Sequence, residues 1–236
     1  MKLLVANWKM NLTVHQTLDW CQNYLELFKE IDHKLIICPS YPALTAVSQL
    51  IKDTDIALCG QSCSEHRNGS YTGQVDAQSL AQVGCSYVLV GHSEERNAFN
   101  LTNEQVAQKA LRVFEAGMIP IICIGEPETV YQAGKTQEYL EEQLFDIKRA
   151  FNGAPAYIAY EPIWAIGTSK IPTNEELIKI VNNLKLFIQG CAFLYGGSVN
   201  AQTIKQLSPI KEFCGYLIGS ASLDGNQLKK IIELLA

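Results

Sequence analysis

The sequence predicts an α/β protein in which eight parallel strands close into one (β/α)8 barrel. Eight short apolar segments recur along the 236 residues, and segments with helical periodicity separate them. Each apolar segment is nearly continuous rather than alternating, which is typical of strands buried on both faces of a parallel sheet. One βα unit per roughly 30 residues is the usual size of that unit, and barrels of this kind have about 250 residues. We therefore expect a single domain over residues 1–236.

The predicted strands and helices alternate along the whole chain. The strands are expected at 3–6, 35–38, 56–59, 87–90, 119–124, 156–160, 191–195 and 216–219. Two helices begin with a capping-box pattern and are followed by a glycine, namely Thr102, Gln105 and Gly117 in one and Thr173, Glu176 and Gly190 in the other. An open doubly wound sheet would place a glycine-rich dinucleotide-binding turn after the first strand. That strand runs instead into Asn-Trp-Lys-Met-Asn, which favours the closed barrel.

The composition is that of an ordinary globular chain, with 47% hydrophobic and 18% charged residues. A net charge of −5 without basic blocks makes the chain a poor binder of nucleic acid or anionic membranes. Its apolar segments are shorter than the roughly 18 residues that span a bilayer. The first residues do not form the apolar core of an export signal. We expect a cytoplasmic protein.

The eight cysteines need a separate explanation, because an even number can indicate disulfides. They form no C-x-x-C pair and have no histidine at ligand spacing, so we expect no bound metal. Disulfides are unusual without export, so we expect reduced thiols. Cysteine in or beside an apolar segment behaves as a small buried hydrophobe. Six of the eight are in such positions, at 38, 59, 85, 123, 191 and 214.

Polar residues directly after the predicted strands are the candidates for chemistry, since barrels of this kind carry their catalytic groups at the carboxyl ends of strands. Asn7 and Lys9 follow the first strand, His92 and Glu94 the fourth, and Glu161 the sixth. Each has an ordinary interpretation when taken alone, as an ion-pair partner, a core histidine or a surface lysine. Together on one rim they supply a carboxylate base, a hydrogen-bond donor and a cation. That set can abstract a proton next to a carbonyl group.

Glycine-bearing turns follow the last two strands, with Ser198 after the seventh and Gly219 and Ser220 after the eighth. One such turn is usually no more than a tight turn. Two of them after the last two strands coincide with the place where barrels commonly bind phosphate. Backbone N–H groups at the starts of the following helices would favour the anion. The sequence therefore predicts a phosphate-bearing substrate.

Two long connections also indicate function. Prolines bracket the segment 162–172, which we interpret as a lid with hinged ends that excludes water. The segment 60–75 is polar and turn-rich. The packing of a compact domain does not by itself account for a loop of that length, so another explanation is needed. Docking onto another subunit and disorder are the two alternatives. Tyr71 and Thr72, which lie between glycines, favour a projecting tip.

These motifs together resemble the triosephosphate isomerase family over the whole chain. The matching stretches are ANWKMN (6–11), VGHSEER (90–96), CIGE (123–126), AYEPIWAIGT (159–168), YGGSV (195–199) and IGSASL (218–223). The resemblance implies the TIM-barrel fold and an isomerase of glycolysis and gluconeogenesis. It also implies interconversion of dihydroxyacetone phosphate and D-glyceraldehyde 3-phosphate through an enediolate, by an obligate homodimer without cofactor or metal.

The resemblance implies a role for each residue that matches a family motif. Glu161 is expected to be the base, His92 the neutral electrophile at the carbonyl, and Lys9 the cation at the substrate. Asn7 is expected to orient the substrate oxygens, and Glu94 to lie near Lys9. Phosphate contacts are implied for the backbone of Gly167, Ser198, Gly219 and Ser220. The lid is implied to contain Pro162, Trp164, Gly167 and Thr168, and Thr72 to be the tip that reaches the partner subunit.

Four positions depart from the family pattern. Ser169 in the lid and Ser220 after the eighth strand stand where glycine is usual, and both retain the backbone N–H that phosphate binding needs. Gln74 replaces a glutamate and Glu95 an arginine, at positions that often form an ion pair between subunits. A glutamate facing Glu95 would be repelled, and Gln74 avoids that repulsion. We predict that the dimer persists with a different contact at the rim of the interface, at which Gln74 and Glu95 lie.

Two other functions are considered. A Schiff-base aldolase would use Lys9, but such an enzyme needs a lysine just beyond an interior strand end, where Glu161 stands after the sixth strand. A barrel that serves only partner binding would show damage to the base, the electrophile or the lysine, and all three are intact. Borohydride trapping of a substrate adduct would support the aldolase, and isotope exchange at the substrate carbons would support the isomerase.

Overall fold

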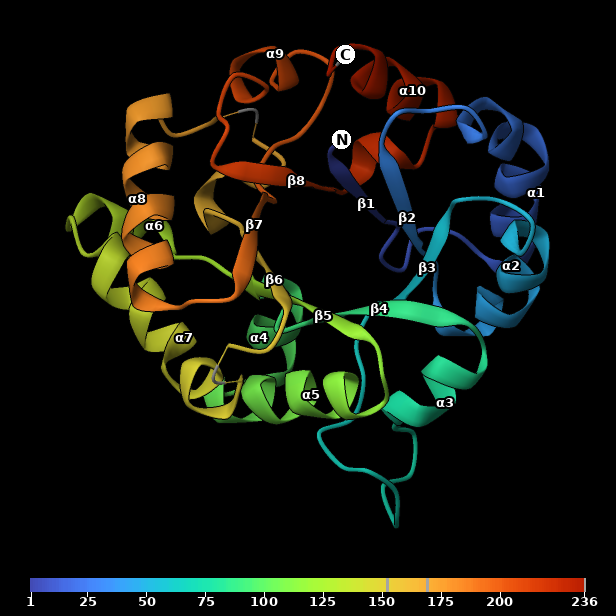
Figure 1. The fold of residues 1–236 in the computed structure, drawn as a ribbon, viewed down its shortest axis with the longest axis horizontal. Coiled ribbons are helices and arrows are strands. Elements are labelled where there is room, and N and C mark those ends of the chain that lie inside the picture. Colours follow the sequence, from blue (N-terminus) through green and yellow to red (C-terminus); the bar gives the residue numbers. More distant parts are fainter. Residues whose placement is uncertain (152, 169, 236) are drawn as a thin grey trace.

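Eight parallel strands form a closed barrel in chain order in the computed structural model, which describes residues 1–151, 153–168 and 170–235 (Figure 1). β1 pairs with β8 as well as with β2, and this pairing closes the barrel. All eight predicted strands are confirmed, with bounds shifted by a few residues at most. They are β1 (Leu3–Asn7), β2 (Lys34–Cys38), β3 (Ala57–Gly60), β4 (Cys85–Val90), β5 (Ile119–Ile124), β6 (Ala156–Tyr160), β7 (Cys191–Tyr195) and β8 (Phe213–Ile218).

Helices surround the barrel on the outside (Figure 1). Both predicted capping boxes are present, at the starts of α5 and α8. The α-helices are α1 (Val14–Tyr24), α2 (Leu44–Ile51), α3 (Ala77–Gln82), α4 (Ser93–Phe99), α5 (Asn103–Glu115), α6 (Glu128–Gln132), α7 (Thr136–Phe151), α8 (Asn174–Phe187), α9 (Ile204–Leu207) and α10 (Gly225–Glu233). Short 3-10 turns are η1 (Leu25–Phe28), η2 (Tyr41–Ala43), η3 (Ile163–Ala165) and η4 (Ser220–Ser222).

The apolar core has two layers, because successive side chains of a strand point to opposite faces. One layer fills the barrel interior and includes Val5, Cys123 and Ala159. The other lies between the strands and the helices and includes the neighbouring residues of the same strands, such as Leu4. The same alternation carries the interior series of β1 on to Asn7 and that of β6 on to Glu161. Both side chains are thereby aimed at the mouth of the barrel.

The thiols agree with the predicted reduced state, since all eight cysteines are free. Burial was correctly expected for four of the six positions named above, but Cys191 and Cys214 are only partly buried. These two lie at the first position of β7 and the second position of β8.

Among the residues that the structure describes, no helix is long and apolar enough to cross a membrane.

The loop between β3 and α3 projects from the body of the molecule (Figure 1). Tyr71 and Thr72 at its tip are exposed. The ring of Tyr71 stacks on that of His66, with centroids 3.7 Å apart, and the loop backbone is tied by a hydrogen bond from Ser64 N–H to the Val75 carbonyl at 2.7 Å. The loop thus has internal contacts of its own, and its docking onto another subunit stays a prediction.

Candidate active site

Glu161 lies directly after β6 and is almost completely buried, at 2% exposure. Its backbone N–H donates to the carbonyl of Ile124 at 2.7 Å, which extends the β5–β6 pairing beyond the strand. Burial raises the pKa of its carboxyl group above the ordinary value, against the lowering effect of His92 and Lys9. A carboxylate whose pKa is raised by burial is a better proton acceptor near neutral pH.

A glycine after β5 makes room for the Glu161 backbone, and sequence reasoning did not assign it a role. A Cβ atom on Gly125 would collide with the carbonyl oxygen of Glu161. The Gln143 side chain holds this peptide from both sides, accepting from Gly125 N–H at 2.9 Å and donating to the Gly125 carbonyl at 3.2 Å. The signal in the sequence that could have indicated this role is a glycine directly after a buried strand, within the CIGE stretch.

His92 is 8% exposed and faces the carboxylate of Glu161, with Nε2 at 3.6 Å from Oε1. It caps the N-terminus of α4, and its Nδ1 accepts the backbone N–H of Glu94 at 3.3 Å. A neutral imidazole that accepts at Nδ1 carries its proton on Nε2. The ring therefore presents an N–H donor to the mouth of the barrel.

Lys9 adopts a left-handed backbone conformation, with φ of 52°, which residues other than glycine rarely adopt. Two side chains hold it there. The Asn7 side-chain oxygen accepts from Lys9 N–H at 3.1 Å, and the Gln61 amide donates to the Lys9 carbonyl at 2.8 Å. The ammonium group lies 2.6 Å from Oε1 of Glu94. Gln61 is a further residue that sequence reasoning missed, because its partner is 52 positions away.

The turn after β8 lies beside Lys9. A Cβ atom on Gly219 would be 3.8 Å from Cε of Lys9. The indole N–H of Trp8 donates to the Ser222 carbonyl at 3.2 Å, which joins the ends of β1 and β8. Ser220 is exposed and begins the 3-10 turn η4. The predicted start of a helix directly after β8 is therefore present as one short turn.

The turn after β7 differs from the prediction, because no helix follows it directly. Ser198 is buried, at 8% exposure, and α9 begins only at Ile204. The side chain of Asn200 accepts the backbone N–H groups of Gln202 and Thr203, at 2.8 Å and 3.0 Å, and so forms a separate turn before the helix. The expectation of a helix start was wrong at this turn.

The predicted lid, of which Ser169 lies outside the described residues, contacts the β5 side of the barrel. The Trp164 indole donates to Oε1 of Glu126 at 3.0 Å, and its ring stacks on Tyr131 with centroids 4.3 Å apart. Glu126 is fully buried, and burial raises the pKa of its carboxyl group. Pro162 is buried at the base of the lid, whereas Gly167 and Thr168 are exposed. Glu126 belongs to a quoted motif but was not predicted as a functional residue.

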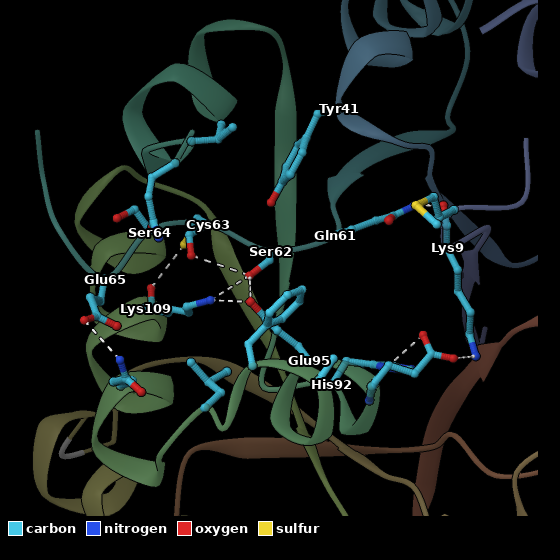
Figure 2. A pocket seen from close by; sticks show the side chains of 18 of the residues that line it. Lys9, Tyr41, Gln61, Ser62, Cys63, Ser64, Glu65, His92, Glu95 and Lys109 are labelled. Carbon is cyan, nitrogen blue, oxygen red and sulfur yellow. Dashed lines mark hydrogen bonds and ion pairs between the residues drawn. The ribbon is translucent and has the colours of Figure 1, made fainter. Parts of the chain in front are cut away.

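A cavity of about 690 Å³ extends from Lys9, His92 and Glu94 to Glu95 and Lys109 (Figure 2). Glu95 and Lys109 form an ion pair, and Ser62 bonds to both, at 2.7 Å to Glu95 and 3.0 Å to Lys109. Lys109 is 7% exposed. Within the part of the chain that the structure describes, Oε2 of Glu95 is buried without a hydrogen-bond partner.

The residues predicted at the dimer interface are thus divided between two places. Glu95 turns into the cavity toward Lys109 of its own chain, a partner that sequence reasoning did not identify. Gln74 lines the same cavity from the base of the projecting loop. Thr72 is exposed at the tip of that loop.

The mouth of the barrel therefore holds one connected cluster of five predicted residues. Its members are Asn7, Lys9, His92, Glu94 and Glu161. A buried carboxylate, an imidazole N–H and an ammonium group can together remove a proton beside a carbonyl and stabilise the resulting oxyanion. No group of three or more His, Cys, Asp or Glu side chains that could hold a metal ion occurs among the described residues.

Comparisons with known proteins agree with this chemistry. A family model described as triosephosphate isomerase matches residues 2–235. The chain is 36% identical to the triosephosphate isomerase of Aquifex aeolicus (strain VF5), over 98% of each chain. It is 38% identical to that of Wolbachia pipientis wMel, over 98% of this chain and 93% of the relative. The triosephosphate isomerase of Mesomycoplasma hyopneumoniae (strain 7448) is 36% identical, over 98% of each chain.

Proposed function

Since the chain belongs to the triosephosphate isomerase family, we propose that the cluster at the barrel mouth is its active site. The protein is an aldose–ketose isomerase that interconverts dihydroxyacetone phosphate and D-glyceraldehyde 3-phosphate, a step of glycolysis. The observation that carries the site assignment is the buried carboxylate of Glu161, with the Nε2 atom of His92 3.6 Å away.

The reaction moves one proton between two neighbouring carbons. Glu161 takes the proton from the carbon beside the carbonyl, and the electron pair moves onto the carbonyl oxygen to form an enediolate. His92 donates its Nε2–H to that oxygen, and the Lys9 ammonium stabilises the same charge. His92 gives its Nε2 proton to the former carbonyl oxygen and takes up the hydroxyl proton from the oxygen on the first carbon. Glu161 then returns its proton to the former carbonyl carbon, and the first carbon becomes the new carbonyl. Because the pKa of Glu161 is raised, it can hold the proton between these two steps.

The phosphate group is proposed to bind to backbone N–H groups at Gly167, Ser198, Gly219 and Ser220. The proximity of Gly219 to Lys9 supports this assignment, because it puts the proposed phosphate contact next to the cation. The side chain of Asn7 positions Lys9 by accepting its backbone N–H, and Glu94 positions the Lys9 ammonium group by an ion pair. The lid residues Pro162, Trp164, Gly167 and Thr168 would exclude water once the substrate is bound.

The active form is proposed to be a homodimer in which the Thr72 tip of one copy enters the cavity of the other. The projecting loop and the 690 Å³ cavity supply the two complementary surfaces. The Glu95 carboxylate lies at this cavity, and the side-chain amide of Gln74 from a second copy is proposed to donate to it. This amide–carboxylate contact would take the place of the usual ion pair between subunits.

The domain and the compartment follow from simpler observations. We propose that residues 1–236 form one domain, which the pairing of all eight strands in one barrel supports. We propose the cytoplasm as the compartment, since the eight free thiols fit a reducing environment.

An assay in both directions with the two triose phosphates, each coupled to a dehydrogenase, tests the activity. Glu161→Gln should lower kcat by about a thousandfold, the usual order for a lost general base. Its Kd for 2-phosphoglycolate, a phosphate-bearing mimic of the enediolate, should change little. Unchanged turnover in Glu161→Gln would contradict the assignment. Trapping of a substrate adduct on Lys9 by borohydride would indicate the aldolase instead.

A further inference from the structure

Trp164, at the start of the lid, has its contacts on one side of the barrel mouth. Its indole N–H bonds to Glu126, which follows β5, and its ring lies on Tyr131 of α6 at an interplanar angle of 29°. The proposed phosphate turns follow β7 and β8. β5 and β7 lie on opposite sides of β6 in the barrel, so Tyr131 and the proposed phosphate turns are on opposite sides of the strand after which the lid begins.

Tyr131 also reaches the far end of the lid. Its hydroxyl group donates to Oε1 of Glu176 in the first turn of α8, at 3.0 Å. The other oxygen of Glu176 accepts from the backbone N–H of Thr173 at 2.8 Å and from its hydroxyl group at 2.9 Å. The Thr173 N–H holds the pKa of the Glu176 carboxyl below its ordinary value, so this acceptor stays charged. One side chain thereby bridges Trp164 at the start of the lid and the helix cap that ends it.

We propose that Tyr131 is a positioning residue of the lid, which stabilises the arrangement described here through its stack on Trp164 and its hydrogen bond to Glu176. The inference rests on the proposed function of the segment 162–172 as a lid. A ligand that needs the lid over the phosphate must break the Trp164–Tyr131 stack. Tyr131 therefore lowers the affinity for such a ligand and speeds the release of product.

The test compares Tyr131→Leu, which removes both contacts, with Tyr131→Phe, which removes only the hydroxyl group. We expect Kd for 2-phosphoglycolate to fall about three- to tenfold in Tyr131→Leu, the range for loss of one aromatic pair. The fall should be smaller in Tyr131→Phe. The value of kcat should fall in the same order, because product release becomes slower. Glu128→Gln, an exposed change on the same helix, is the matched control and should leave both quantities unchanged.

A spectroscopic measurement separates lid position from a general structural effect. With 5-fluorotryptophan incorporated, the 19F signal of Trp164 is assigned by its loss in Trp164→Phe. In ligand-free Tyr131→Leu this signal should move toward its position in the ligand-bound wild type. Unchanged or weaker ligand binding in both Tyr131 variants, with an unmoved Trp164 signal, would overturn the proposal. Failure of the wild type to bind 2-phosphoglycolate would instead contradict the proposed function.

Discussion

A Cβ atom on Gly196 would lie 2.6 Å from Cγ of Glu161. The Gly196 N–H donates to the carbonyl of Tyr160 at 2.8 Å, so the backbone after β7 is fixed against the end of β6. The side chain of Glu161, the proposed base, occupies the space that a side chain at position 196 would need. The turn after β7 therefore has a role in placing the carboxylate as well as a proposed role in binding phosphate.

Gly196→Ala should displace the Glu161 carboxylate from its place beside His92. A misplacement of about 1 Å can cost about a hundredfold in rate, so we expect kcat to fall by that order while KM changes little. Steady-state kinetics would measure both. Gly134→Ala has open space for its methyl group but lies at a φ of 68°, so it should lower stability while the folded enzyme keeps the wild-type kcat. A wild-type kcat in Gly196→Ala would show that the contact is unimportant.

The pH profile should show the raised pKa of Glu161. Because burial disfavours the carboxylate, the base becomes protonated at a higher pH than an ordinary glutamate, whose pKa is about 4.3. We expect kcat/KM to decline on the acid side with an apparent pKa above that value. The profile is measured with the coupled assay, with excess coupling enzyme checked at each pH. An acid limb at or below the ordinary value would be inconsistent with this role of burial.

Glu161 should also reduce the stability of the folded protein at neutral and alkaline pH. A carboxyl group whose pKa is raised on folding favours the folded state only while it is protonated, and this contribution is lost as pH rises through the raised pKa. Glu161→Gln should therefore raise the free energy of unfolding at pH 8, by about 1.4 kcal/mol for each unit of pKa difference. The gain should shrink toward pH 5. Urea unfolding at both pH values measures it, and a gain that grows on acidification would contradict the argument.

Lys109→Met should destabilise the protein, because it leaves the partly buried Glu95 carboxylate without its ion-pair partner. Removal of one member of a fully buried ion pair costs about 3–5 kcal/mol, and the loss here should be smaller because the Glu95 side chain is 19% exposed. Urea unfolding would measure this loss. The double variant Lys109→Met with Glu95→Leu should recover most of the stability, since no charge is left unpaired. Equal stability of the single variant and the wild type would mean that solvent or a second copy already compensates for Glu95.

Substitution of Glu95 is also expected to affect dimer formation. Glu95→Ala removes the proposed acceptor for Gln74 of a second copy and should weaken the dimer. Sedimentation velocity at micromolar concentration would detect this as a shift toward monomer. The wild type itself should sediment as a dimer under the same conditions, and a monomeric wild type would contradict the proposed assembly.

Much of the fold could be predicted because its signals are local. Nearly continuous apolar segments marked strands buried on both faces, and capping boxes at Thr102 and Thr173 marked helix starts. The position of a residue at the end of a strand is also a local property. For that reason the sequence predicts Lys9, His92 and Glu161 as site residues without any knowledge of their contacts. The helix start expected directly after the β7 turn was wrong, because the side chain of Asn200 forms a separate turn before α9.

The barrel, the rim on which its polar residues gather, and the family that its motifs resemble can all be inferred from the amino-acid sequence. Which side chains hold those polar residues in place depends on the folded structure. Gly196 beside Glu161, Gln61 on the Lys9 carbonyl, Lys109 on Glu95 and Tyr131 on Trp164 are all contacts between separate elements. Such contacts depend on how neighbouring units pack and on the register between strands. Periodicity and capping patterns describe one element at a time, so they do not contain this information.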